Sequence, residues 1–325
     1  MATPWSSCPL CACGEIVRRF EIEESMFGTG EVFDYVECGQ CGSLRIDTIP
    51  EQLSSYYGSG YYTNLGSRSR VVGSLLARRD AAAFTRRGVV GRLVDWWQPN
   101  SGLRVLARAD IRKDARILDV GCGSGSMLRS MAAAGHQNLI GVDPFVEQDI
   151  HCNGKVLVRK GRVGDLSGPY DLVMFHHSLE HMADPADSLR EARRLLDDET
   201  GRCLVRVPTV SSWAWRQYGT AWIQLDPPRH LFVPSMSGLE TALGGAGFEI
   251  ERVEYDSTGF QIWGSEQAKR GIAVMSWKSV RMNPLLALAR GRALASAARA
   301  ARSLNVRRVG DQIAVWARPG RNERR

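Results

Sequence analysis

Short apolar runs alternate with amphipathic stretches over the last two thirds of the chain. Runs of four to eight residues bounded by turn-forming residues are typical of buried strands, and apolar spacing of three to four residues is typical of helices. Two helices are well marked, over 126–134 and 189–196. This alternation predicts an α/β fold with a mainly parallel sheet. The expected strands are 117–120, 139–142, 155–158, 171–175, 203–207, 248–255 and 312–317.

The same pattern predicts how the chain is divided. A length of 325 residues suits about two domains and a connecting segment. Between the last two strands we expect a helical insertion at about 258–308. Within it, Asn283-Pro284 is typical of an N-cap followed by a first-turn proline, and predicts a helix to about Ser303. The expected parts are a small module at 1–50, a helical connector at 51–110 and the α/β domain at 111–325.

Charge is concentrated at the end of the chain. The net charge is +7, yet residues 267–325 hold 14 Lys and Arg and only two acidic residues. Such a region is most often a solvated helix surface. It is also suited to phosphate, nucleic acid or peripheral contact with an anionic membrane.

Nothing in the sequence has the pattern of a signal peptide or a membrane-spanning helix. We therefore expect a cytoplasmic protein whose cysteines are reduced or bound to metal. The oligomeric state cannot be deduced from these patterns.

Four of the eight cysteines form two Cys-x-x-Cys pairs, Cys8/Cys11 and Cys38/Cys41. Two such pairs can complete a tetrahedral four-sulfur site, which is the geometry that zinc prefers. Because four protein ligands leave no open position, the predicted Zn²⁺ is structural. A disulfide or free-thiol cluster is the alternative, and Cys13 is a fifth thiol nearby.

A glycine-rich turn joins the first strand of the α/β domain to the following helix. Its residues are Gly121, Cys122, Gly123, Ser124 and Gly125. Such a turn lets a ligand approach the backbone closely. Its Gly-x-Gly-x-Gly spacing differs from the Gly-x-Gly-x-x-Gly of dinucleotide sites.

Two acids accompany this turn. Asp119 precedes it by two residues, where a carboxylate would repel pyrophosphate but attract a sulfonium or an ammonium group. Asp143 ends the next strand, at the position of a ribose-binding carboxylate. The two acids therefore predict a cofactor that carries a ribose and a positively charged group. An NAD-binding or non-catalytic α/β domain is the alternative.

The segment from Ile117 to Gly125 resembles the first motif of class I S-adenosylmethionine-dependent methyltransferases, and 170–181 resembles their fourth strand and the loop after it. The resemblance implies a Rossmann-like seven-stranded sheet with helices on both faces and the last strand antiparallel. It implies that Asp143 holds the ribose, that the turn lies against the methionine moiety and that His177 lines the pocket. The adenine would be bordered by Val163, Gly164 and Asp165. With the N-terminal zinc ribbon, the chain is also similar to bacterial methyltransferases of sugar and polysaccharide pathways.

Methyl transfer from a sulfonium needs orientation of donor and acceptor and, for many acceptors, a base. His230, in the stiff loop Asp226-Pro227-Pro228-Arg229-His230, is the first candidate, and His181 is the second. The alternatives are an Asp226–Arg229 pair that only holds the loop, and a Glu180-His181 segment that only braces the next helix.

A small-molecule or glycan acceptor, lipid-linked in one version, is the favoured prediction. A nucleic-acid methyltransferase and a non-catalytic cofactor-binding protein are the alternatives. Nucleic acid is disfavoured because the ribbon has only two arginines, Arg18 and Arg19, against seven acids between Glu15 and Glu37.

Overall fold

The computed structural model describes residues 3–57, 75, 78–80, 82, 88–91, 94, 100–152 and 154–320. Most of the predicted helical connector at 51–110 lies outside these residues. Its described parts include a short 3-10 helix η1 (Leu53–Tyr57) and helix α4 (Ser101–Arg108). No helix in the described part of the chain is long and apolar enough to cross a membrane.

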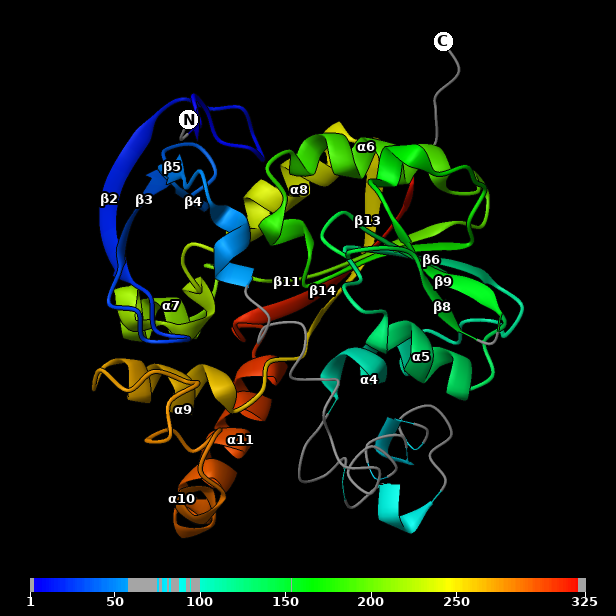
Figure 1. Cartoon of the computed structure of the whole chain (residues 1–325). Helices are drawn as coiled ribbons and strands as arrows, with labels where there is room; N and C mark the ends of the chain where they lie inside the picture. The colour runs from blue at the N-terminus through cyan, green and yellow to red at the C-terminus, as the bar shows by residue number, and fades with distance from the viewer. Residues whose placement is uncertain are drawn as a thin grey trace.

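The centre of the molecule is an eight-stranded sheet with the spatial order β13-β14-β11-β10-β6-β7-β9-β8 (Figure 1). Strands β9, β7, β6, β10 and β11 run parallel. β14 pairs antiparallel with both β11 and β13, so the predicted antiparallel last strand is confirmed. The bounds are β6 Arg116–Val120, β7 Asn138–Asp143, β8 Ile150–Cys152, β9 Lys155–Lys160, β10 Leu172–His176, β11 Arg202–Pro208, β13 Phe248–Tyr255 and β14 Gln312–Pro319.

All seven strands predicted from the apolar runs are present. The eighth, β8, is a three-residue edge strand that pairs antiparallel with β9. Its sequence, Ile150-His151-Cys152, is too short to stand out as an apolar run.

Helices cover both faces of this sheet. α4 and α5 (Ser126–Ala133) lie on one face, and α6 (Pro185–Leu195) and α8 (Met236–Gly245) lie on the other (Figure 1). Successive strand side chains point to opposite faces. Leu172 and Met174 accordingly pack with the α4 and α5 side, whereas Val173 and Phe175 pack with the α6 and α8 side.

The N-terminal module is a smaller sheet that includes one strand from the α/β domain. Its order is β12-β4-β3-β2, with β2 Ile16–Glu23, β3 Val32–Cys38 and β4 Leu44–Ile46. β12 (Phe232–Val233) comes from the α/β domain, and Phe232 and Val233 pair with Arg45 and Leu44. The strand before β2 and the strand after β4, β1 (Thr3–Pro4) and β5 (Thr48–Ile49), form a separate antiparallel pair.

The segment between β13 and β14 is largely helical. It contains α9 (Phe260–Ala268), α10 (Pro284–Ala289) and α11 (Gly291–Val306). Asn283 caps α10, because its side chain accepts a hydrogen bond from the Leu286 amide. The single helix predicted to about Ser303 is two helices, since Arg290 (φ −96°, ψ 14°) leaves the helical conformation beside Gly291. Further helices and turns between residues 154 and 260 are α7 (Trp213–Tyr218), η2 (Val163–Asp165), η3 (Leu179–His181), η4 (Gly219–Ala221) and η5 (Ile223–Leu225).

Candidate functional site

The glycine turn after β6 adopts a conformation that favours glycine. Gly121, Gly123 and Gly125 have φ values of 71°, 54° and 73°. A Cβ on Gly121 would lie 2.5 Å from the Cβ of Ser178, so this position also requires the absence of a side chain. With no side chain at these three positions, the turn consists mainly of backbone where it lies at the carboxyl edge of the parallel strands, the edge at which open α/β sheets bind ligands.

The side chain of Cys122 packs under the turn. A Cβ on Gly141 of β7 would meet its Sγ at 2.2 Å, which shows how closely the thiol approaches that strand. Burial raises the pKa of the Cys122 thiol. The thiol of Cys122 is therefore un-ionised near neutral pH and packs against β7, while its backbone belongs to the glycine turn.

Two buried carboxylates lie beside the turn. Asp119 is 2% exposed, and its Oδ1 has no hydrogen-bond partner among the described residues. Burial, and after it the nearby Asp143, raise the pKa of Asp119. A cationic ligand would relieve this cost, because an opposite charge favours the ionised form.

Asp143 organises the turn. Its two carboxylate oxygens accept hydrogen bonds from the amides of Gly123 and Phe145, each at 2.8 Å. Burial raises the pKa of Asp143, and these amide bonds act in the opposite direction. The predicted ribose contact would use the remaining lone pairs of a carboxylate that is already fixed in place.

The predicted adenine border is a single 3-10 turn, η2. Val163 is buried, while Gly164 and Asp165 are exposed. The Asp165 carboxylate accepts from the Arg162 amide at 2.8 Å, so this side chain holds its own turn.

His177 follows β10 and has a positive φ of 53°. Its Nδ1 lies 3.1 Å from Oε1 of Glu180, and its Nε2 lies 3.0 Å from the side-chain amide of Gln312 in β14. Burial lowers the pKa of His177, with Arg206 and His230 adding to the effect. The ring is half-buried and is held from both sides.

His181 and His230, the two candidates for the base, lie together. Their ring centroids are 4.8 Å apart. Nδ1 of His181 lies 2.7 Å from the carbonyl oxygen of Arg229, and Nδ1 of His230 lies 2.8 Å from that of Gln224. Because a carbonyl oxygen can only accept, Nδ1 carries the hydrogen in both rings, and in the neutral form of each ring the lone pair is on Nε2.

Glu180 lies between these histidines. Its side chain is fully buried, and its Oε1 is 4.0 Å from Nε2 of His230. Burial lowers the pKa of His181 to about 4, with His230 adding to the effect, so this ring is neutral near pH 7. Glu180 therefore meets three imidazoles, those of His177, His181 and His230.

The loop that carries His230 is held by buried charge. Arg229, 1% exposed, pairs with Asp226 of its own loop and with Glu24 of the N-terminal module, the latter at 2.7 Å. Glu24 also accepts from the amides of residues 26 to 29. Attraction to Arg229 holds the pKa of Asp226 low despite burial, which acts to raise it. The predicted Asp226–Arg229 pair is present, and it reaches a third group that the sequence did not indicate.

Two tyrosines add contacts that sequence reasoning missed. Tyr35 of β3 donates to the carbonyl oxygen of His230 at 2.5 Å. The hydroxyl of Tyr57 lies 3.0 Å from Nδ1 of His181, and its ring stacks on Phe145, two residues after Asp143. Neither tyrosine was among the site residues predicted from the sequence, because each contacts a loop that is more than 120 residues away in the chain.

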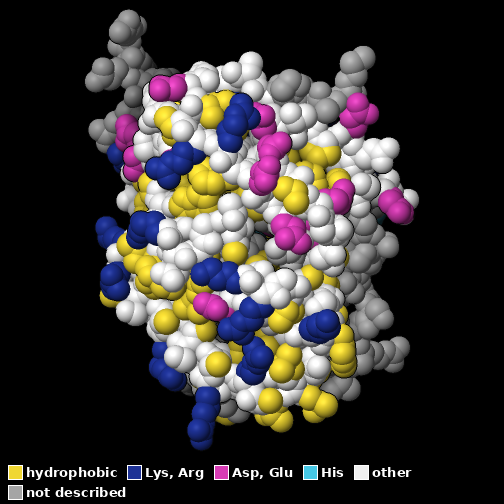
Figure 2. Space-filling view, turned by 90° about the vertical axis from the view of Figure 1, so that its left-hand side faces the viewer, with side chains coloured by type: hydrophobic (Ala, Val, Ile, Leu, Met, Phe, Trp, Pro, Cys, Tyr) yellow, Lys and Arg dark blue, Asp and Glu magenta, His cyan; other side chains and the backbone are white. Residues whose placement is uncertain are grey.

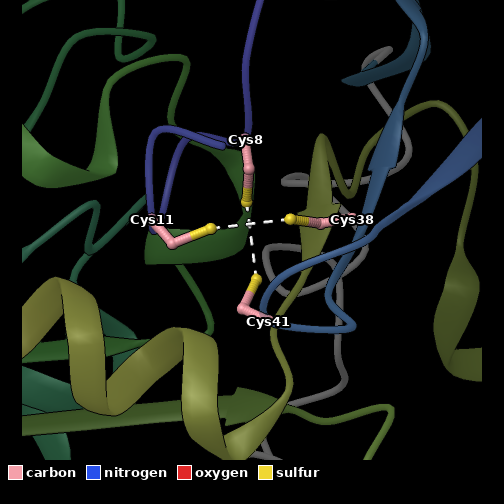
Figure 3. Close-up of side chains that lie close together, drawn as sticks. All are labelled: Cys8, Cys11, Cys38 and Cys41. Carbon is pink, nitrogen blue, oxygen red and sulfur yellow. Dashed lines mark hydrogen bonds between the residues drawn. The ribbon is translucent and has the colours of Figure 1, made fainter. Parts of the chain in front are cut away.

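The four predicted metal ligands point toward one another (Figure 3). The Sγ atoms of Cys8 and Cys41 are 3.6 Å apart, and those of Cys11 and Cys38 are 3.5 Å apart. Tetrahedral zinc with Zn–S bonds of about 2.3 Å places sulfurs roughly 3.8 Å apart, so the donor set and spacing fit a zinc ion. Cys13 instead accepts from the amide of Glu15.

A separate cleft of about 590 Å³ lies at the opposite edge of the sheet. Residues at the amino ends of β6, β10 and β11, among them Ala115, Asp171 and Arg202, line it. Open α/β sheets bind ligands at the carboxyl edge, so this cleft is not the candidate site.

Comparison with known families agrees with this geometry. Residues 98–253 match a family described as "Methyltransferase domain". The matched segment contains the glycine turn, Asp143 and the histidine cluster, and the sequence prediction of a methyltransferase domain is thereby confirmed.

Individual relatives are more distant. The ubiquinone biosynthesis O-methyltransferase of Azorhizobium caulinodans is 29% identical over 157 residues, which are 43% of this chain and 61% of that protein. The protein of the same name from Nitrosospira multiformis is 33% identical over 122 residues, 31% of this chain and 51% of that protein. The chain thus spans between half and three fifths of these relatives. Among solved structures, an S-adenosylmethionine-dependent methyltransferase from Mesorhizobium loti has a TM-score of 0.42 at 18% identity, covering 67% of this chain and 97% of that one.

Proposed function

We propose that the protein transfers a methyl group from S-adenosylmethionine to a small-molecule or glycan acceptor. One observation carries the proposal: Asp119, with an unpartnered oxygen, and Asp143, bound to the turn, flank a positive-φ glycine turn at the carboxyl edge of parallel strands. A sulfonium cofactor supplies a positive charge beside Asp119 and ribose hydroxyls for Asp143. The names of the relatives favour an acceptor hydroxyl.

Catalysis on the acceptor is assigned to His230, with His181 as the second candidate. The free Nε2 of His230 is suited to accept a proton from a hydroxyl or an acidic C–H group. His230→Ala is expected to lower turnover by about 10²–10⁴ and to leave cofactor affinity nearly unchanged.

The test combines calorimetric titration with S-adenosylmethionine and a screen of small-molecule, glycan and RNA acceptors with isotopically labelled cofactor. His151→Gln, an exposed histidine of β8, is the matched control. A folded protein without measurable cofactor binding would overturn the proposal. Methylation of RNA alone would move it to the nucleic-acid class.

We also propose that a structural Zn²⁺ is held by Cys8, Cys11, Cys38 and Cys41. With this ion, residues 1–50 would form the zinc ribbon that the sequence resemblance implies. The ion would serve stability, since no ligand position stays open. Elemental analysis should find one tightly held zinc per chain, and Cys38→Ser should lose it and destabilise the module. Zinc-free protein with intact disulfides would contradict this assignment.

Peripheral contact with an anionic membrane stays a proposal for the insertion. Leu285, Leu288 and Trp277 are 79%, 72% and 69% exposed. Lys278 and Arg292 are exposed nearby in the sequence, and Figure 2 shows basic and apolar side chains together over the lower part of the view. Cosedimentation with phosphatidylserine vesicles that Leu285→Glu abolishes would support it, and identical sedimentation of wild type with neutral vesicles would count against it.

A further inference from the structure

We infer that Glu180, His181 and His230 form a second metal site, for a divalent transition metal, separate from the four cysteines. One ligand atom from each of the three residues lies within 4.8 Å of the others. The residues come from η3 and from the loop before β12, so two segments about fifty residues apart build the cluster.

Both imidazoles are prepared to act as ligands. Each donates its Nδ1 hydrogen to a backbone carbonyl oxygen, of Arg229 for His181 and of Gln224 for His230. This arrangement fixes the ring and leaves the lone pair of Nε2 available, which is the usual second-shell pattern around a metal-binding histidine.

The carboxylate supplies the independent observation. Glu180 is fully buried, and its Oε2 has no hydrogen-bond partner among the described residues. The nearby Arg229 guanidinium is engaged by Asp226 and Glu24 instead. A buried carboxylate with an unsatisfied oxygen is costly, and a bound cation would satisfy it.

The donor set selects the class of metal. Two imidazoles and one carboxylate suit Mn²⁺, Fe²⁺, Co²⁺ or Zn²⁺ rather than Ca²⁺ or Mg²⁺, which prefer all-oxygen sites. Three protein ligands leave open positions for an oxygen of a small molecule. This last role rests on the proposed function: the metal would hold the oxygen of the methyl acceptor. His230 would then act as a ligand rather than as the base.

The site can be tested without an activity assay. Protein with zinc in the cysteine cluster is titrated with Co²⁺ alone, by calorimetry and visible absorption. Wild type and the control His151→Gln should bind one Co²⁺ per chain, without the thiolate charge-transfer absorption that replacement of the cysteine-bound zinc would produce. Glu180→Gln and His230→Asn should each weaken binding by at least about 10-fold.

Circular dichroism and zinc content verify that each variant is folded, and His181→Asn serves where Glu180→Gln does not fold. Saturable binding that all folded ligand variants retain, or no binding by wild type, overturns the site. S-adenosylmethionine is titrated into the same samples. Wild type that binds cofactor but no Co²⁺ removes only the metal site, whereas the reverse result removes only the methyltransferase assignment.

Discussion

The glycine turn at 121–125 and the loop at 224–233 lie at the same edge of the sheet but are built differently. The turn is contiguous in sequence, is shaped by three positive-φ glycines and is fixed by one nearby acid, Asp143. The loop is held by groups from distant parts of the chain, including Glu24, Tyr35 and Tyr57.

Under the proposed function, this difference would separate the part that binds the cofactor from the part that carries the proposed base. Backbone conformation prepares the turn for a cofactor, whatever the N-terminal module does. The position of His230 depends on that module, because Tyr35 bonds its carbonyl oxygen and Glu24 pairs with the preceding Arg229. The small module thus supports the loop that carries His230, which we propose to lie on the acceptor side.

Removing the charge of Arg229 tests this dependence most strongly. Arg229→Met leaves Glu24 and Asp226 buried without their cation, and should lower the free energy of unfolding by about 3–5 kcal/mol. Urea unfolding measures the loss. Arg190→Met, which breaks an exposed pair with Asp187, is the control and should cost less than about 1 kcal/mol. Equal effects of the two substitutions would show that the buried pair does not hold the loop.

The turn has its own test in Gly121→Ala. The new Cβ would have a φ of 71° and would lie 2.5 Å from Ser178, so strain and overpacking together should cost about 2–4 kcal/mol. Gly244→Ala is the control, because this helical glycine of α8 has open space around it. The substitution should raise the free energy of unfolding by about 0.5–1 kcal/mol. Thermal unfolding compares the two, and a Gly121→Ala protein as stable as wild type would contradict the assigned strain.

Cofactor affinity should respond to Asp143 and not to the distant loop. Asp143→Ala removes the proposed ribose ligand and should weaken S-adenosylmethionine binding by about 1.5–3 kcal/mol in titration calorimetry. Asp198→Ala, at an exposed ion pair with Arg193, is the control. Unchanged affinity in a folded Asp143→Ala protein would reject the ribose assignment.

The same contrast explains what the sequence could predict. The strands follow from apolar runs, and the turn, Asp119 and Asp143 follow from local spacing. Most of the fold and the proposed cofactor-binding residues could therefore be predicted from the sequence. The cluster of four cysteines could be predicted for the same reason, because the spacing within each pair fixes the local geometry.

The residues on the proposed acceptor side could be predicted only in part. His181 and His230 stood out as histidines after strands, but nothing local indicated that Glu180 would be buried between them or that Glu24 would reach Arg229. These contacts depend on β12 joining the sheet of the N-terminal module. A two-residue strand has too little pattern to predict its partner.

The smallest expected effect concerns the pH dependence of stability. Burial lowers the pKa of His181 to about 4 in the folded protein, below the value of about 6.5 expected in the unfolded chain. Between these values the unfolded chain binds a proton that the folded protein does not, so stability is fully present above pH 6.5 and is lost as the pH falls toward 4. His181→Gln has no such group. On lowering the pH from 7 to 5, wild type should therefore lose about 1–2 kcal/mol more than this variant in urea unfolding. His151→Gln, which removes an exposed histidine, should follow wild type over the same range. If wild type and His181→Gln instead changed in parallel, the pKa of His181 would not be lowered in the folded protein, and the conclusion that burial keeps this ring neutral well below pH 6.5 would have to be withdrawn.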